Sequence, residues 1–143
     1  MNGRHEQKPS TAYVALGSNL GNRERALRLT LQKLGELPET RVAQSSAFHE
    51  TDPVGGPPQG KFLNAAARLE TGLEPLELLR GLQKIEREMG RPAEHERWGP
   101  RAIDLDLLTY DDLALQTSEL TLPHPRMHER PFVMIPLNEI KNR

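Results

Sequence analysis

Residues 103–110 read IDLDLLTY, and this alternation of apolar and acidic residues predicts a β-strand with one buried face. Successive side chains of a strand point to opposite faces, so Asp104 and Asp106 share one face, with Cα atoms about 7 Å apart. Neighbouring carboxylates repel each other unless a cation lies between them, and Mg²⁺ commonly binds one or two carboxylates together with phosphate oxygens. The stretch therefore predicts either a metal and phosphate site or a half-exposed strand whose aspartates face water.

The segment just before this strand, residues 91–101 (RPAEHERWGPR), is rich in arginine. It holds Arg91, Arg97 and Arg101, together with Trp98, the one tryptophan of the chain. Guanidinium groups bind phosphate oxygens in bidentate geometry, and a metal ion can hold the same phosphate from the other side. A solvated loop of mixed charge is the alternative, which the two glutamates of the segment favour. Because the arginines and the aspartate pair occur together, the sequence favours a phosphate site.

Outward from this strand, hydrophobic periodicity and turn residues divide the chain into strands and helices. Strands are predicted at 11–16, 41–51, 62–71 and 103–110, amphipathic helices at 21–37 and 74–89, and a short last helix at 132–140. The pattern at 62–71 fits either a strand or a helix, and a strand is preferred there. The order strand, helix, strand, strand, helix, strand is that of the split βαβ unit. We therefore expect an α+β fold, a ferredoxin-like sandwich with both helices on one face of an antiparallel sheet and the other face free to carry a site.

The helix at 74–89 is the best marked of these elements. Pro75 lies in its predicted first turn and Gly90 follows its predicted end, which is the usual placement of these two residues. Its predicted apolar stripe consists of Leu76, Leu79, Leu82 (or Gln83), Ile85 and Met89. For the helix at 21–37, the capping residue is left open among Ser18, Asn19 and Asn22.

Composition narrows the function classes. The chain has 143 residues and a mass of 16.1 kDa, which predicts one domain over residues 11–143 after a polar, flexible tail at residues 1–10. A formal net charge of −1 creates no overall field toward nucleic acid or anionic lipid. The absence of cysteine excludes disulfides, thiolate zinc sites and a cysteine nucleophile. No run approaches the roughly 20 apolar residues of a membrane helix, so a cytoplasmic protein is expected.

Two weaker signals lie outside the acidic strand. His124 stands between two prolines and is followed by Arg126 and Arg130, so this region either adds donors to a phosphate site or decorates a turn. Phe62 and Phe132, with the tryptophan, can enclose a flat heterocycle, although core packing is the alternative for each ring.

Five short motifs of this chain occur together in a specific order. They are GSNLG at 17–21, FLNA at 62–65, RWGPR at 97–101, DLD at 104–106 and LPHPR at 122–126. From about residue 11 to residue 137 the chain resembles the 6-hydroxymethyl-7,8-dihydropterin pyrophosphokinase family of folate biosynthesis. The most specific part of the resemblance is the block RWGPR-x-x-D-x-D. The resemblance implies the ferredoxin-like fold and the transfer of pyrophosphate from ATP to the hydroxymethyl group of the pterin, with AMP as the other product.

The resemblance also implies roles for individual residues. Two Mg²⁺ ions would be bound by Asp104 and Asp106, which count among the expected catalytic residues with Arg91 and Arg101. The expected ATP-binding residues are Glu86, Arg91, Arg97, Trp98, Arg101, His124 and Arg130. The expected pterin-binding residues are Thr51, Asp52, Pro53, Val54, Phe62, Asn64, Trp98, Asp104 and Phe132. Ala93 stands where some family members carry a further arginine.

Two other functions compete with this interpretation. A Mg²⁺-dependent phospho- or nucleotidyltransferase acting on another small alcohol would keep the aspartates and arginines but not the aromatic pocket. A ferredoxin-like RNA-binding module would need exposed aromatic and basic residues on its sheet, whereas aromatic residues make up 4% of the chain. We expect a monomer that binds its small-molecule substrates, ATP and the hydroxymethyl dihydropterin, and that binds neither nucleic acid nor a membrane.

Overall fold

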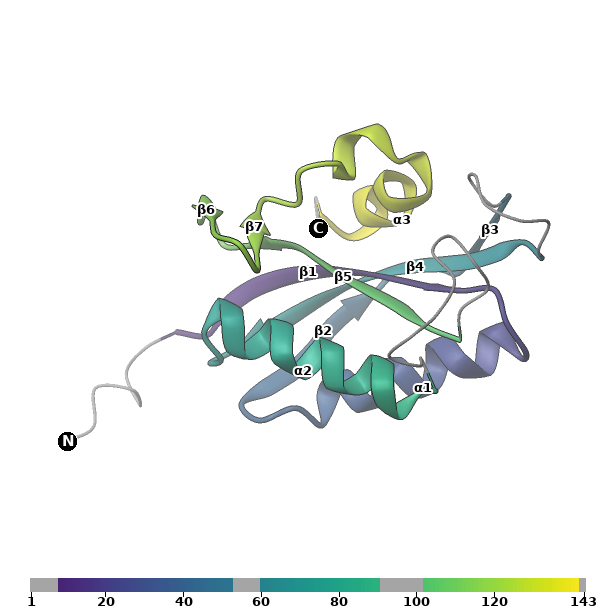
Figure 1. The fold of residues 1–143 in the computed structure, drawn as a ribbon, viewed down its shortest axis with the longest axis horizontal. Helices are drawn as coiled ribbons and strands as arrows, with labels where there is room; N and C mark the ends of the chain where they lie inside the picture. Colours follow the sequence, from purple (N-terminus) through teal and green to yellow (C-terminus); the bar gives the residue numbers. More distant parts are fainter. Residues whose placement is uncertain (1–7, 53–59, 91–101, 142–143) are drawn as a thin grey trace.

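The computed structural model describes residues 8–52, 60–90 and 102–141. The elements follow the predicted order, including the last helix, with a short hairpin added (Figure 1). They are β1 (Ser10–Ser18), α1 (Arg23–Gly35), β2 (Thr40–Ser45), β3 (His49–Thr51), β4 (Phe62–Thr71), α2 (Pro75–Glu88), β5 (Asp104–Tyr110), β6 (Leu115–Gln116), β7 (Thr121–Leu122), a 3-10 turn (Met127–Glu129) and α3 (Pro131–Lys141). Among these described residues, no helix is long and apolar enough to cross a bilayer.

The main sheet is antiparallel, with the order β2-β4-β1-β5, and β3 pairs with β4 beyond the end of β2. This order is the one expected for two interleaved βαβ units, so the predicted ferredoxin-like α+β fold is confirmed. β1 lies in the centre, between β4 and β5. The central position of β1 brings the strand that carries Phe62 and Asn64 and the strand that carries Asp104 and Asp106 to either side of it.

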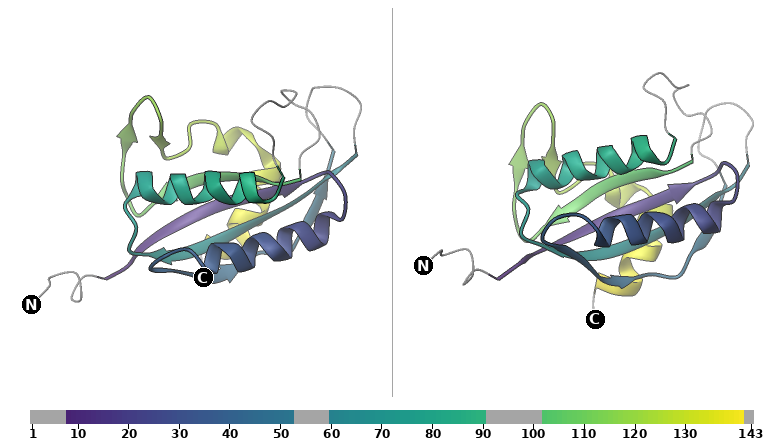
Figure 2. Two further views of the ribbon diagram at one scale, coloured as in Figure 1. Left: turned by 60° about the horizontal axis from the view of Figure 1, so that its bottom comes forward. Right: turned by 90° about the horizontal axis from the view of Figure 1, so that it is seen from below.

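The helices α1 and α2 cover one face of the sheet, which we call the leucine face (Figure 2). Its core packs leucines of the strands against α1 and α2, among them Leu16, Leu69 and Leu107 from the sheet and Leu27, Leu34, Leu78 and Leu82 from the helices. Each fully buried leucine contributes about 1.5–3 kcal/mol. The predicted stripe of α2 was wrong at Leu76, which is 42% exposed, because the helix turns Leu78 inward instead.

The opposite face, which we call the site face, is not left free as the sequence predicted. The last helix α3 packs across β4 and β1, as the ribbon shows above the sheet in Figure 1. Val133, Leu137 and Ile140 of α3 pack with Ala15 and Ala66 of the strands. These alanines let the helix approach the sheet closely. The sequence predicted the helix itself but held no signal for the face that it covers.

Specific residues set the ends of the two long helices. The side chain of Asn22 accepts a hydrogen bond from the backbone N–H of Arg25 at 3.0 Å, so it is the cap of α1 among the candidates. Glu74 and Glu77 form a reciprocal capping box at the start of α2. Gly90 follows α2 with a φ of +93°, a conformation that favours glycine.

The predicted strand at 41–51 is interrupted between β2 and β3. The backbone N–H of Ser46 donates to the carbonyl of Ala66 at 2.8 Å, and the Ser46 hydroxyl accepts the N–H of Ala66 at 2.9 Å. Beyond this point, the N–H of Ala47 turns to the carboxylate of Glu139 on α3, at 3.0 Å. The side chain of Ser46 therefore replaces a backbone partner of β4, which ends the regular ladder and offsets β3.

Candidate active site

A row of three residues crosses the site face on adjacent strands. In the strand register, Gly17 of β1 lies opposite Asp104 of β5 on one side and Asn64 of β4 on the other. A Cβ atom at Gly17 would lie 3.0 Å from Oδ1 of Asn64 and 3.6 Å from Cδ1 of Phe62. Glycine thus leaves open the space between the carboxylate and the amide. The row forms a floor on which a ligand can contact both side chains.

The acidic pair lies on the site face, as the alternation predicted. Asp104 and Asp106 are half-buried, while Leu105 and Leu107 between and beyond them are buried in the core of the leucine face. Asp106 lies opposite Ala15, two residues along β1 from the glycine. Small residues on the central strand therefore flank both carboxylates.

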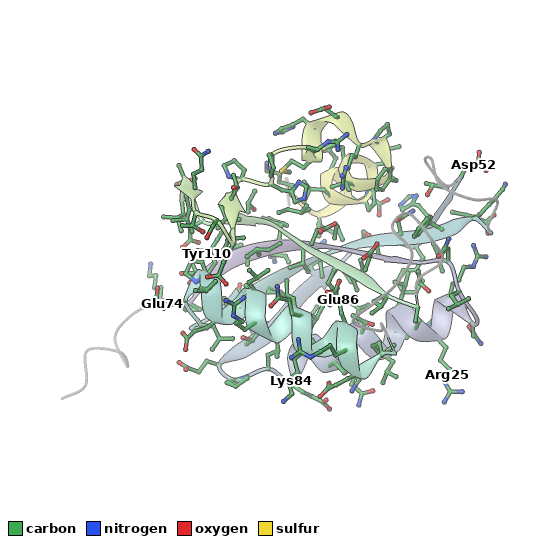
Figure 3. The ribbon with its side chains drawn as sticks, viewed as in Figure 1. Arg25, Asp52, Glu74, Lys84, Glu86 and Tyr110 are labelled. Atoms are coloured by element: carbon green, nitrogen blue, oxygen red, sulfur yellow. The ribbon has the colours of Figure 1, made fainter. Side chains whose placement is uncertain are left out.

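Glu86, predicted to bind ATP, contacts the strand that carries the aspartates. Its Oε2 accepts the backbone N–H of Leu105 at 2.9 Å, and the residue is 8% exposed (Figure 3 labels it on α2). β5 is an edge strand of the main sheet, so the backbone N–H of Leu105 has no strand of the described chain on its outer side to bond to, and the Glu86 carboxylate accepts its hydrogen bond instead. The contact holds Leu105 in place and with it the two aspartates on either side. Its predicted role toward ATP stays a prediction.

The donor set fits a hard cation that is shared with a ligand. Within residues 8–52, 60–90 and 102–141, no group of three or more His, Asp or Glu residues could hold a metal ion by itself. Two carboxylates on one strand face supply oxygen ligands, which Mg²⁺ prefers, and Mg²⁺ usually completes its shell with water and substrate phosphates. The pair therefore suits a metal that arrives with a phosphate ligand better than a permanent structural ion.

His124 lies on the same side of the molecule as the acidic pair. Its backbone N–H donates to the carbonyl of Leu108 on β5 at 2.7 Å. Burial lowers the pKa of His124, the nearby charge of Asp106 opposes this shift, and Arg130 and Arg126 add to it. Burial therefore favours the neutral form of the ring.

The neutral ring of His124 has a defined donor. Its Nδ1 accepts the backbone N–H of Arg126 at 3.2 Å, so the proton of the neutral ring lies on Nε2. Arg130 lies on the same segment, 5.9 Å from the centroid of the Phe132 ring. The structure therefore brings His124, Arg130 and Asp106 close enough for their charges to interact, which the sequence left open.

The predicted pterin residues at the other end of the floor lie together in part. Asn64 is 5% exposed, and its Nδ2 donates to the hydroxyl of Thr51 at 2.5 Å. Phe62, at the start of β4, is half-buried beside Gly17. Phe132 lies at the start of α3 and packs against the core of the site face. Asp52, by contrast, has a side chain that is 84% exposed and contacts Lys61 at 3.9 Å.

Six of the predicted residues lie outside the described part of the chain: Pro53, Val54, Arg91, Arg97, Trp98 and Arg101. The structure therefore brings together the acidic pair, His124 and Arg130 on one side and Asn64, Thr51 and Phe62 on the other. Gly17 was not among the predicted site residues, because the strand predicted at 11–16 ends just before it. The pairing of three strands, which no local pattern contains, is what reveals its place.

Comparison with known proteins agrees with this geometry. Residues 13–142 match the model of the family described as 7,8-dihydro-6-hydroxymethylpterin-pyrophosphokinase (HPPK). The chain is 49% identical over 129 residues to the 2-amino-4-hydroxy-6-hydroxymethyldihydropteridine pyrophosphokinase of Bacillus subtilis, covering 90% of this chain and 77% of that protein. It is 45% identical over 130 residues to the enzyme of the same name from Haemophilus influenzae, covering 91% and 81%.

Solved structures show the same fold. A structure described as HPPK-DHPS in complex with substrates superposes with a TM-score of 0.73 at 14% identity, covering 94% of this chain and 40% of that one. The HPPK-DHPS of Plasmodium falciparum gives a TM-score of 0.68 at 16% identity, covering 93% and 40%. The match to the family model and the relatives at 45–49% identity show that the chain belongs to the 7,8-dihydro-6-hydroxymethylpterin pyrophosphokinase family, the enzymes that transfer pyrophosphate from ATP to the hydroxymethyl group of this pterin in folate biosynthesis.

Proposed function

We propose that this chain carries out the pyrophosphate transfer of its family on the site face, with the ATP phosphates over Asp104 and Asp106 and the pterin over Asn64. The single observation that carries this assignment is the row from Asp104 through Gly17 to Asn64. It supports a site in which a metal-binding carboxylate and a ring-binding amide face the same space. The glycine between them leaves room for the hydroxymethyl group and the phosphate that it attacks.

On the phosphate side, Asp104 and Asp106 would hold two Mg²⁺ ions together with the triphosphate. Bound magnesium neutralises charge on the phosphate oxygens, which is the chief requirement of phosphoryl-type transfer. Nε2 of His124 can donate a hydrogen bond to a phosphate oxygen, and Arg130 adds a positive charge on the same segment. Arg91, Arg97, Trp98 and Arg101 are proposed to complete the ATP site, Arg91 and Arg101 also in catalysis, and Glu86 to keep β5 in register.

On the pterin side, the amide of Asn64 is oriented by its hydrogen bond to Thr51. Because Nδ2 donates to that hydroxyl, Oδ1 is directed to the Gly17 side, where it can accept an N–H of the pterin ring. Phe62 and Phe132 are proposed to stack on the ring, with Asp52, Pro53 and Val54 at the rim. Fixing the ring in this way orients the hydroxyl for in-line attack on the β-phosphorus.

The test of this site is the removal of each ligand charge. We expect Asp104→Asn and Asp106→Asn each to lower turnover about 10³-fold, because losing one metal ligand removes several kcal/mol of charge stabilisation. The assay mixes protein, Mg-ATP and 6-hydroxymethyl-7,8-dihydropterin and separates AMP from ADP. Unfolding temperatures should stay near that of the unmodified protein, since both side chains are half-exposed.

The matched control is Asp112→Asn, which changes an exposed aspartate just after β5. It should release AMP at the unmodified rate. Release of AMP at the unmodified rate by both site variants as well would remove the metal role from this strand. Formation of ADP in place of AMP would indicate a simple phosphate transfer.

We also propose that the chain acts as a single-domain monomer in the cytoplasm. The described residues assigned to the two substrates come from one chain, on the main sheet, α2, α3 and the segment before α3, which supports a site that needs no second copy. Light scattering should give a mass near 16.1 kDa, with or without ATP. A mass near twice this value for the active enzyme would contradict the proposed monomer.

A further inference from the structure

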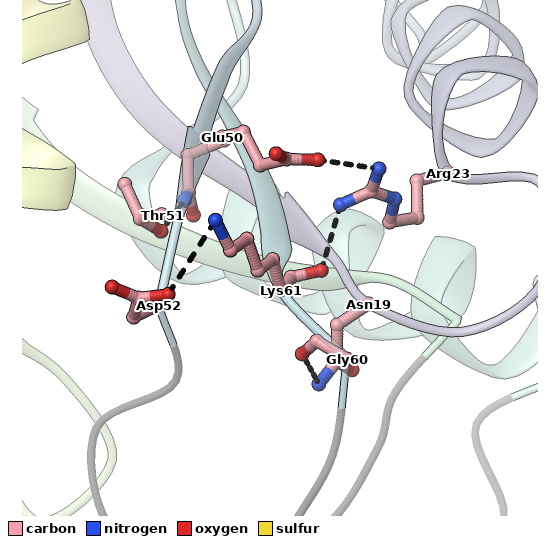
Figure 4. A network of polar contacts seen from close by, with 8 residues as sticks. Asn19, Arg23, Glu50, Thr51, Asp52, Gly60 and Lys61 are labelled. Atoms are coloured by element: carbon pink, nitrogen blue, oxygen red, sulfur yellow. Dashed lines mark hydrogen bonds and ion pairs between the residues drawn. The ribbon is translucent and has the colours of Figure 1, made fainter.

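Arg23, the first residue of α1, contacts both strands of the β3–β4 hairpin (Figure 4). Its Nη2 donates to Oε2 of Glu50 on β3 at 2.7 Å, and its Nη1 donates to the backbone carbonyl of Lys61, just before β4, at 2.8 Å. In the loop between β1 and α1, Nδ2 of Asn19 donates to the backbone carbonyl of Gly60 at 3.3 Å. One planar guanidinium group thus joins the end of one strand to the beginning of the next.

The contacted residues lie directly beside residues assigned to the pterin. Glu50 pairs with Leu63 on the leucine face, whereas its neighbour Thr51 pairs with Phe62 on the site face. Side chains alternate along a strand, so Arg23 contacts β3 on the leucine face, whereas Thr51 of the same strand points to the site face. Moving β3 relative to β4 would change the hydrogen bond that orients Asn64.

On the side of α1, Phe48 just before β3 and Leu63 of β4 pack against the core of the leucine face, and Cζ of Arg28 lies 5.8 Å from the centroid of the Phe48 ring. Among the described residues, β3 has three residues and pairs with β4. A hollow of about 450 Å³ lies beside the contact and is lined by residues of the α1 start and by Phe48 and Leu63. The side chain of Arg23 lines this hollow, so its two hydrogen bonds add a polar connection to the apolar contacts on this side.

The electrostatics of the contact agree with a defined ion pair. The hydrogen bond and the charge of Arg23 hold the pKa of Glu50 below its usual value, with a smaller contribution from Lys61. The side chains of Arg23 and Glu50 are 30% and 48% exposed, and pairs this exposed add little to overall stability. Their effect is therefore expected in the local placement of the hairpin.

We propose that Arg23 is a positioning residue for the pterin pocket, which sets Thr51 and Asn64 by clamping β3 to the start of β4. The inference rests on the proposed assignment of Thr51, Phe62 and Asn64 to the pterin. It predicts a defect confined to the pterin, because the aspartates for the phosphates lie on β5, which Arg23 does not contact through either bond.

The test compares Arg23→Gln and Arg23→Lys with the unmodified protein. Arg23→Gln should raise the KM for hydroxymethyl dihydropterin about tenfold, since two hydrogen bonds of a charged group are lost. The KM for ATP should stay within about twofold, because charge at the aspartates is unchanged. Arg23→Lys keeps the charge but not the fork, so it should restore only part of the pterin affinity. Direct pterin binding in the presence of a non-hydrolysable ATP analogue checks the same ranking.

The matched control is Arg41→Gln at the other end of β4. Arg41 contacts one carboxylate oxygen of Glu70 on β4, with its Nε at 3.1 Å and its Nη2 at 2.7 Å. Like Arg23, Arg41 is an arginine that contacts a glutamate of the main sheet. Its partner Glu70 lies at the opposite end of β4 from the residue that pairs with Thr51. Its substitution should leave both KM values unchanged.

A double-mutant cycle with Glu50→Gln isolates the clamp. If Arg23 acts partly through Glu50, the double variant should be no worse for pterin than Arg23→Gln alone. Unchanged pterin affinity in Arg23→Gln, or an equal loss for both substrates, would overturn the inference. If Asp106→Asn abolishes AMP release while Arg23→Gln binds pterin normally, the clamp fails and the proposed active site stands. If Asn64→Ala also binds pterin normally, the pocket assignment itself fails.

Discussion

The leucine face and the site face are made from the same strands but differ in what they contain. On the leucine face, large apolar side chains interlock with two helices, as in Leu16, Leu69 and Leu107. On the site face, the strand positions between them hold Ala15, Gly17 and Asp106. The difference shows that alternation along a strand lets one side stabilise the fold while the other carries polar and small residues for a ligand.

The two faces should therefore respond differently to substitution. Truncating a side chain of the leucine face leaves a cavity in a packed core, and its cost appears in the free energy of unfolding. Changing a polar residue of the site face removes little packing, and its cost should appear in binding or turnover. Three further substitutions, in order of decreasing effect, test this separation.

The largest effect on stability is expected for Leu69→Ala. Leu69 is fully buried in β4 on the leucine face. The substitution should lower the free energy of unfolding by about 3 kcal/mol, through lost transfer energy and the remaining cavity. Urea unfolding measures this loss, and KM values taken well below the unfolding midpoint should be unchanged. A large change in pterin or ATP affinity at full folding would show that the two faces are coupled.

Much of this separation can be read from the sequence, because it depends on local patterns. The alternation of residues 103–110 placed Leu105 and Asp106 on opposite faces, and the strand predicted at 62–71 has the bounds of β4. The ends of α2 followed from Pro75 and Gly90, whose backbone preferences act within one turn. Apart from the strand at 62–71, for which the pattern alone also allowed a helix, these predictions are confirmed because they require no knowledge of distant contacts.

What could not be predicted depends on residues far apart in the chain. Ser46 ends β2 through bonds to Ala66, and Glu139 on α3 binds the N–H of Ala47, so the interruption of the predicted strand is tertiary in origin. The covering of the site face by α3 depends on two alanines that meet only in the folded sheet. For the site, the register that brings Gly17 between a carboxylate and an amide was equally invisible.

Gly17→Ala tests the site face without removing any polar group. The new Cβ would lie 3.0 Å from Oδ1 of Asn64, so that amide must shift by a few tenths of an ångström. We expect the KM for pterin to rise about tenfold, with a change in unfolding free energy below about 1 kcal/mol, since alanine is otherwise acceptable in a strand. The control Gly35→Ala, whose Cβ would meet Val42 at an ordinary 4.0 Å, should leave the KM unchanged. Unaltered pterin affinity in Gly17→Ala would remove this glycine from the floor.

The smallest effect is expected at Glu50, where a polar contact lies on the leucine face. Arg23 lowers the pKa of Glu50 in the folded protein, so the folded state favours the ionised carboxylate more than the unfolded state does. This stabilisation is present above the ordinary glutamate pKa of about 4.3 and is lost as the pH falls through the folded value. Glu50→Gln should therefore lower the unfolding temperature slightly at pH 7 and flatten its decline in acid, whereas Glu36→Gln, at the exposed residue just after α1, serves as the control. An equal acid decline in the unmodified protein and Glu50→Gln would show that the clamp adds no charge-dependent stability, which would leave the backbone bond to Lys61 as the part of it that acts.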